Sequence, residues 1–265
     1  MKKKLKILGL LTVFFFLLIL LPVNAQKKEP PPKKEIPEVA GTYDDPDHPG
    51  IKVRVFVYKT KPDNKPVKPP EPTPLLRCDL DDPESTNIVA KERWVLPDEW
   101  SYNLNPNSVP LTVGKSNLEI IAKNAFDRWS DATEEIFFKK GKDTKIIRQA
   151  YDGINLIAWG QTRGTALAVT YIRFYPDNGA VVDVDTIMNN KFKWSWSNST
   201  VCAYENTYDA ENILTHELGH WIGLDDMYDI TYFQHATMYG YGAPTEVKKI
   251  TLSAGDKTGA YQIYH

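Results

Sequence analysis

The chain has 265 residues, of which 42% are hydrophobic, and its 32 basic and 34 acidic side chains give a net charge of −2. This length suits one domain with a sizeable core. Residues 78–265 alone hold 17 basic and 26 acidic residues, and so acidic a surface argues against a nucleic acid as partner.

Residues 1–25 have the composition of an export signal. Lysines stand at positions 2, 3, 4 and 6, an apolar run extends through Leu21, and Val23-Asn24-Ala25 follows as a small-residue cleavage site. We expect a cleaved signal peptide and a secreted, extracellular protein with no other membrane segment. Because the apolar run is near the lower limit for a membrane span, an uncleaved N-terminal anchor is the alternative.

Residues 26–77 differ from the rest in composition. They contain twelve of the chain's nineteen prolines and no tryptophan, so they cannot bury much of a core. Residues 51–58 alternate Ile and Val with other side chains, which predicts a strand. The segment is either a Pro-rich linker with a transient extended stretch or a short prosegment that lies along a cleft as a strand.

Residues 78–265 are expected to be the folded unit, since they hold all seven tryptophans. Residues 116–129 predict a helix in which Ser116 and Glu119 form a capping box. One face of this helix is apolar and comprises Leu118, Ile121, Ala122, Ala125, Phe126 and Trp129. Apolar runs of strand length follow around Ile146 and at 155–159, 166–174 and 180–188, before a second helix at 209–222. This order predicts an α+β domain with a mostly parallel sheet.

The stretch HELGHWIGLDD, residues 216–226, carries the most specific chemistry. His216 and His220 are four apart on a helix and can offer their imidazoles to one metal ion, while Glu217 lies beside that ion as a base for a metal-bound water. Gly223 can end the helix in a left-handed conformation, so that Asp226 reaches the same ion. Three protein ligands leave a fourth position open, as in a catalytic zinc site.

HELGHWIGLDD resembles the extended HExxHxxGxxH/D signature of the metzincin metallopeptidases. The resemblance implies that His216, His220 and Asp226 bind Zn²⁺ and that Glu217 is the general base. An aspartate as third ligand is similar to the snapalysin-like branch, whereas most members have histidine. Asp225 and His235 are the alternatives to Asp226 in this role.

Other segments are similar to the matrixin-like members of that clan. Met238 in ATMYGYG resembles the Met-turn beneath the metal, residues 94–104 the opening strand, and residues 252–264 the closing helix. Residues 164–173 resemble the edge strand beside which the family lays its substrate antiparallel. The resemblance therefore implies a metzincin-like zincin catalytic domain with a twisted, mostly parallel sheet, an active-site helix and a Met-turn.

Two further groups leave alternatives open. Cys78 and Cys202 are the only cysteines, and after export they are expected to form a disulfide. Leu76-Arg77-Cys78 is also similar to a cysteine switch, in which a prosegment thiolate closes the metal's open position. Asp183 and Asp185 point to one face of a strand, where they either help to bind structural Ca²⁺ or are solvated.

These observations predict a secreted zinc-dependent endopeptidase that hydrolyses peptide bonds through a metal-bound water activated by Glu217. We expect a monomer that acts on a protein or peptide substrate. The alternative is a non-catalytic, zinc-stabilised extracellular binding or adhesion module, although such a module has no need of a carboxylate beside the open position.

Overall fold

In the computed structural model, residues 35–61 and 74–265 are described, and Glu35–His265 forms one folded unit. The predicted signal peptide at residues 1–25 lies outside the described residues. Among the residues that are described, no helix is both long and apolar enough to cross a bilayer.

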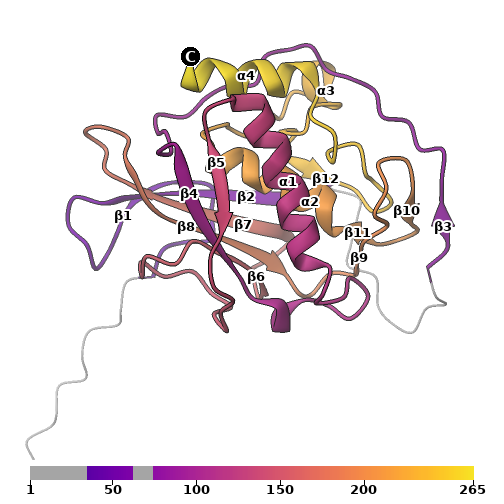
Figure 1. Ribbon diagram of the computed structural model, residues 1–265, viewed down its shortest axis with the longest axis horizontal. Coiled ribbons are helices and arrows are strands. Elements are labelled where there is room, and N and C mark those ends of the chain that lie inside the picture. The colour runs from indigo at the N-terminus through magenta and orange to yellow at the C-terminus, as the bar shows by residue number, and fades with distance from the viewer. Residues whose placement is uncertain (1–34, 62–73) are drawn as a thin grey trace, which may run out of the picture. The chain divides into compact units, whose positions relative to one another are not determined.

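A mixed sheet forms the frame of this unit. Its strands are β1 (Gly41–Asp44), β2 (Lys52–Thr60), β4 (Glu99–Leu104), β5 (Phe137–Lys140), β6 (Leu156–Gly160), β7 (Ala166–Phe174), β8 (Val181–Asn189) and β12 (Tyr241–Gly242). They follow the order β1-β2-β7-β8-β6-β4-β5, and β12 also pairs with β2 (Figure 1). Two small sheets pair β3 (Leu76–Arg77) with β10 (Ala203–Tyr204), and β9 (Trp194–Ser195) with β11 (Tyr208–Asp209).

The direction of each strand follows from its connection. A helix links β4 to β5, and β4, β5, β6 and β8 pair in parallel, as crossover connections allow. A short turn links β7 to β8, so these two strands pair antiparallel, and β1 and β2 continue the antiparallel half. The α+β class is confirmed, with parallel pairing from β8 through β6 and β4 to β5, antiparallel pairing from β8 through β7 and β2 to β1, and β12 parallel to β2.

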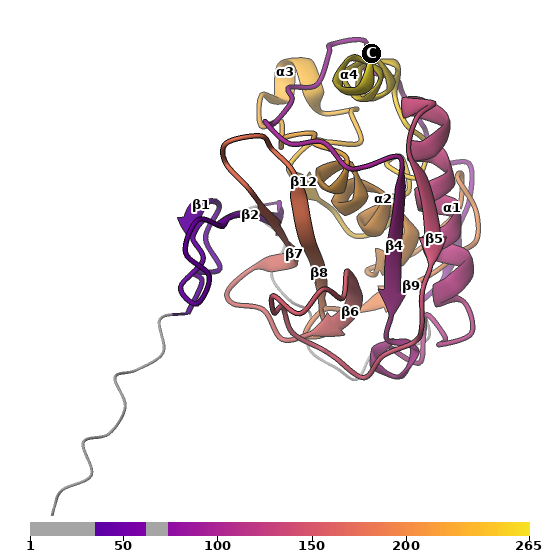
Figure 2. The ribbon, with the colours of Figure 1, turned by 60° about the vertical axis from the view of Figure 1, so that its left-hand side comes forward.

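The helices lie against one face of the sheet (Figure 2). They are α1 (Leu118–Thr133), α2 (Ala210–Trp221), the short α3 (Ile230–Phe233) and α4 (Ala254–Tyr264), and a 3-10 turn, η1, spans Pro106–Ser108. The opposite face holds a smaller cluster of strand residues that is covered by Ile36, Tyr43 and Ile146.

Helix α1 has the predicted apolar face, since Leu118, Ile121, Phe126 and Trp129 are all buried. The predicted capping box at Ser116 is wrong. Residues 114–117 form a turn in which the Asn117 amide donates to the carbonyl of Gly114, so the helix starts only at Leu118.

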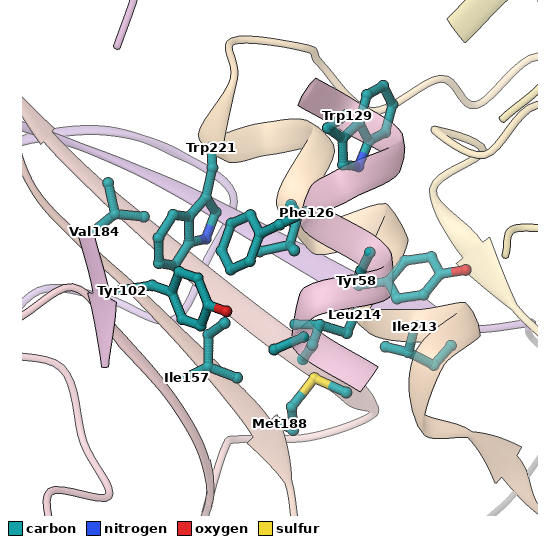
Figure 3. Close-up of a cluster of buried hydrophobic side chains, with 14 of the residues drawn as sticks. Tyr58, Tyr102, Phe126, Trp129, Ile157, Val184, Met188, Ile213, Leu214 and Trp221 are labelled. Atoms are coloured by element: carbon teal, nitrogen blue, oxygen red, sulfur yellow. The ribbon is translucent and has the colours of Figure 1, made fainter. Parts of the chain in front are cut away.

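Aromatic rings between α1, α2 and the sheet form the centre of the core (Figure 3). The ring of Phe126 lies 4.3 Å from those of Tyr102 and Phe138 and 5.4 Å from that of Trp221, measured between centroids. Each such side chain contributes about 1.5–3 kcal/mol through its burial. This packing fixes α2 against α1 and the sheet.

The predicted strands at 155–159, 166–174 and 180–188 are confirmed as β6, β7 and β8. The strand expected around Ile146 is wrong, because the chain there is irregular and the carbonyl of Ile146 accepts from the side chain of Asn105. Strand β5 was not predicted. Residues 164–173 were expected at an edge, but β7 is paired on both sides, with β8 and with β2.

The strand predicted at residues 51–58 is β2, which is buried within the sheet. A linker with a transient extended stretch does not describe this element, because β2 pairs with three neighbours, β1, β7 and β12.

Cys78 and Cys202 form a disulfide beside the β3–β10 pair. The predicted disulfide is confirmed, and the cysteine switch is wrong because Cys78 is bonded to Cys202.

Candidate metal centre

Helix α2 presents the motif residues as the sequence predicts. Its N-terminus is capped by Asp209, whose side chain accepts from the amides of Glu211 and Asn212 at 3.0 and 3.1 Å. After the helix, Gly223 has a φ of +105°, a conformation that strains any residue with a Cβ. The chain thereby turns back, and the Leu224 amide donates to the carbonyl of Gly219.

Each histidine is held in place by a hydrogen bond from one of its own ring nitrogens. Nδ1 of His216 donates to the carbonyl of Thr237 over 2.7 Å, and Nδ1 of His220 donates to the carbonyl of Leu224 over 2.9 Å. Since a carbonyl can only accept, each Nδ1 carries the proton and each Nε2 keeps a free lone pair.

The two Nε2 atoms converge on one carboxylate. Oδ1 of Asp226 lies 3.2 Å from Nε2 of His216 and 3.6 Å from Nε2 of His220. Zinc bonds of about 2.0–2.1 Å in a tetrahedron place ligand atoms roughly 3.3 Å apart, so the spacing suits that ion. Among the described residues, these three form the group of donors close enough to hold a metal.

Unsatisfied polar atoms mark the same point. Nε2 of His216, Nε2 of His220, Oδ1 of Asp226 and Oε1 of Glu217 are all buried and have no hydrogen-bond partner among the described residues. Buried polar atoms are normally paired, and leaving one unpaired costs about 1–3 kcal/mol. Three of these atoms converge within 4.8 Å of one another and fit a bound cation, and the fourth belongs to Glu217, the residue after His216 on α2.

Burial also sets the charge of these groups. It lowers the pKa of His216 and of His220 to about 3, so both imidazoles are neutral, the form that binds a metal. Burial raises the pKa of Glu217 to about 8, against a hydrogen bond from Thr170 that lowers it. The chemistry of this donor set therefore matches a divalent cation.

Asp226, and not Asp225 or His235, completes the cluster. The hydroxyl of Tyr228 donates to Oδ2 of Asp226 over 3.1 Å, which leaves Oδ1 for the histidines. Asp225 instead accepts from Arg54 at 3.1 Å, and His235 lines a separate cavity of about 450 Å³.

The predicted Met-turn lies beneath α2. A Cβ built on Gly219 would lie 2.2 Å from Sδ of Met238, so only glycine lets the two segments approach this closely. The amides of Thr237 and Met238 donate to the buried carboxylate of Asp256 at 2.7 and 3.1 Å. Asp256 thus fixes the turn whose Thr237 carbonyl orients His216.

Sequence reasoning missed a chain of hydrogen bonds that holds Glu217. Thr170 donates to Oε2 of Glu217, Thr170 and Thr186 share a hydrogen bond of 2.7 Å, and Nε1 of Trp221 donates to Thr186 at 2.9 Å. The two threonines are neighbours on β7 and β8, and nothing in the sequence pairs them.

Two side chains of β2 cover the centre. The ring of Phe56 stacks on His220 with 3.8 Å between centroids, and the ring of Tyr58 stacks on His216 with 3.9 Å. His216, Glu217 and His220 are 0% exposed.

Asp183 and Asp185 share one face of β8, as predicted. The cation that pairs with them is the side chain of Arg173. Nη1 of Arg173 lies 2.7 Å from Asp183 and 3.2 Å from Asp185, and Nε of Arg173 lies 3.2 Å from Asp45. The expectation of solvated carboxylates is wrong because both are buried, and no calcium ion is assigned to them.

Comparison with known proteins agrees with this geometry. A search of curated protein sequences finds no significant match. The profile of the matrixin family matches residues 93–265, which include β4, the helices α1, α2, α3 and α4, and the whole candidate metal centre. The fold and the predicted family are thereby confirmed, and the family consists of zinc metallopeptidases. The chain belongs to the matrixin family.

Proposed function

We propose that this protein is an exported zinc-dependent endopeptidase in which His216, His220 and Asp226 hold Zn²⁺ and Glu217 is the general base. The observation that carries the proposal is that three buried atoms without partners converge within 4.8 Å, while Glu217, the neighbour of His216 on α2, also keeps a buried carboxylate oxygen without a partner. Residues 1–25 would direct export, and the protein would act as a monomer on a protein or peptide substrate.

Each residue of the site has a separate role in the proposed reaction. Zn²⁺, when bound, polarises the scissile carbonyl and lowers the pKa of a coordinated water. Oε1 of Glu217 would accept the proton of the attacking water and return it to the leaving amine, while Thr170 holds Oε2 and so keeps the carboxylate in place. The hydrogen bonds from both Nδ1 atoms keep the Nε2 lone pairs directed at the metal.

The alternative is a zinc-stabilised binding module without catalysis. Glu217 favours the enzyme, because a structural site gains nothing from a buried carboxylate oxygen without a partner on the residue next to a metal ligand.

The test uses zinc-loaded full-length protein in which Phe56 and Tyr58, which cover the centre, are both replaced by alanine. Cleavage of an unstructured protein is compared with that by the same variant carrying Glu217→Gln, and with a control carrying Glu119→Gln on the exposed side of α1. We expect at least a hundredfold loss for Glu217→Gln alone, with one zinc still bound per chain.

Equal cleavage by all three proteins would overturn the role of Glu217. If the Phe56→Ala/Tyr58→Ala protein that retains Glu217 binds one zinc and cleaves nothing, the binding module would be favoured.

A further inference from the structure

Strand β2 lies outside the matrixin match, yet it is built into the sheet beside the metal centre. The match begins at residue 93, whereas β2 spans Lys52–Thr60. Without β2, strand β7 would be the edge of the sheet. A free edge offers unpaired amides and carbonyls to any extended peptide, and β2 takes that place.

Strand β2 pairs with both β7 and β12, as an extended peptide bound in a cleft between them would. It runs antiparallel to β7 in register from Lys52↔Phe174 to Lys59↔Ala166, and it runs parallel to β12 through Lys59↔Tyr241 and Thr60↔Gly242. Main-chain bonds of this kind bind an extended chain whatever its sequence, and side-chain pockets supply the selectivity.

Alternation sends two aromatic rings of β2 towards α2. Phe56 and Tyr58 join the cluster between sheet and helices, and they stack on His220 and His216 with interplanar angles of 8° and 16°. Val55 and Val57 point to the opposite face. Because the histidines and Glu217 are 0% exposed, no substrate reaches them while these rings are in place.

The ring of Tyr58 fills a fully buried pocket bounded by β12 and α2. A Cβ built on Gly242 would lie 3.1 Å from the hydroxyl oxygen of Tyr58 and 3.3 Å from Cδ1 of Ile213 on α2, and Figure 3 labels both side chains. Nζ of Lys249 lies 5.7 Å from the ring centroid, within the range of a cation–π contact.

The hydroxyl of Tyr58 is buried and has no hydrogen-bond partner among the described residues. A buried tyrosine normally finds a partner, and the missing bond weakens the hold of this pocket on β2. Arg54 adds ion pairs at the rim, 2.8 Å from Glu92 and 3.1 Å from Asp225, all partly exposed. These pairs are mostly buried but lie outside the core, so they help to hold β2 and can be removed without disturbing the core, whereas the missing Tyr58 bond is the weak point of that hold.

We propose that β2 is an inhibitory strand that occupies in cis the cleft where this enzyme binds its substrate, with Phe56 and Tyr58 in the side-chain sites above the two histidines. The proposal rests on the peptidase function proposed above. It identifies the substrate class as extended peptides with aromatic side chains at two alternate positions. Such a peptide binds antiparallel to β7 only after β2 has left.

The test compares zinc-loaded full-length protein with its Phe56→Ala/Tyr58→Ala variant. The control is Phe138→Ala, which removes a partly buried ring that packs on Phe126 away from the cleft. A quenched fluorescent peptide with two aromatic residues at alternate positions reports cleavage. We expect at least a tenfold higher rate for the double variant and no increase for the control.

The synthetic peptide KVRVFVYKT, which is the sequence of β2, supplies the second readout. Fluorescently labelled, it should bind the double variant and not the parent, whose cleft is full, and a version with alanine in place of both aromatic residues should bind neither. It should also suppress cleavage by the double variant, and cleavage of the peptide itself would equally show that the cleft accepts it.

The outcomes separate the two proposals. Equal cleavage by parent and double variant would overturn the inhibitory strand and leave the peptidase intact. If neither protein cleaves but the labelled peptide binds only the double variant, β2 still occupies a peptide-binding cleft, whereas the peptidase function and the inhibition of it by β2 are overturned. Absence of both cleavage and binding overturns the strand proposal. If the double variant does not fold, cleavage and peptide binding are measured instead on Arg54→Gln, which loosens β2 from outside the core. The same outcomes then support or overturn the proposal.

Discussion

Tyr228 and Asp226 are joined by a hydrogen bond in which the phenol donates to Oδ2 over 3.1 Å. The bond leaves Oδ1 of the carboxylate directed at both Nε2 atoms. Removing a group that orients a metal ligand in this way typically weakens metal binding by about 10- to 100-fold.

Replacing Tyr228 by phenylalanine should therefore weaken zinc binding by about tenfold, because Asp226 loses the contact that fixes its rotation. Competition with a chelator of known affinity measures the effect. Tyr232→Phe, on the exposed side of α3, is the matched control and should change nothing. Unchanged affinity in Tyr228→Phe would show that Asp226 is oriented by other contacts.

Gly219→Ala should destabilise the fold by about 1–3 kcal/mol, because its methyl group would lie 2.2 Å from Sδ of Met238. Urea denaturation gives the change in the free energy of unfolding. Adding Met238→Ala should recover part of the loss, and this non-additivity is the signature of a direct contact. If the two substitutions were simply additive, Met238 would not be what excludes a side chain at position 219.

Arg173→Leu should lower the free energy of unfolding by about 3–5 kcal/mol at pH 7, since it leaves Asp45, Asp183 and Asp185 buried without their cation. Burial already raises the pKa of Asp183 to about 6, against the attraction of Arg173, and the loss of that attraction would raise the pKa further. The folded state would then bind more protons than the unfolded state, so the deficit should shrink as the pH falls towards 4.

Denaturation curves at several pH values measure this dependence. Arg163→Leu, whose pair with Glu35 is exposed, serves as control with a change within about 1 kcal/mol. A deficit in Arg173→Leu that stayed constant with pH would contradict the assignment.

Removing the disulfide by Cys78→Ser and Cys202→Ser should cost about 2–4 kcal/mol, because the cross-link spans 124 residues and restricts the unfolded chain. The difference from the parent should vanish when both are denatured under reducing conditions. Cys78→Ser alone should not raise peptidase activity. Activation by that single change would revive the cysteine switch.

The sequence predicted which side chains lie together at the candidate metal centre, because their grouping is local. His216, Glu217 and His220 lie on one helix, and Gly223 brings Asp226 back within four more residues. Helical periodicity and turn geometry are enough to place them together. The apolar face of α1 was predicted for the same reason.

Features that depend on pairing between distant segments were not predicted. Thr170 meets Glu217 only because β7 packs against α2, and Asp256 reaches the Met-turn from the start of α4. The prediction that β7 lies at the edge of the sheet was wrong for the same reason. No local pattern tells where the strand at residues 52–60 will pair. Ser116 failed as a cap because Gly114 turns the chain just before α1.

The place of the disulfide in the chain has a consequence for β2. Cys202 anchors Cys78, whereas β2 ends at Thr60 and precedes that anchor, so a cut between residues 61 and 78 would leave no covalent link from β2 to the metal centre. Before the cut, the strand competes at an effective concentration of about a millimolar; afterwards, it is an ordinary dissociable ligand at the concentration of the enzyme. Dilution alone would then favour its loss, and a single peptide bond would decide between a closed cleft and an open one.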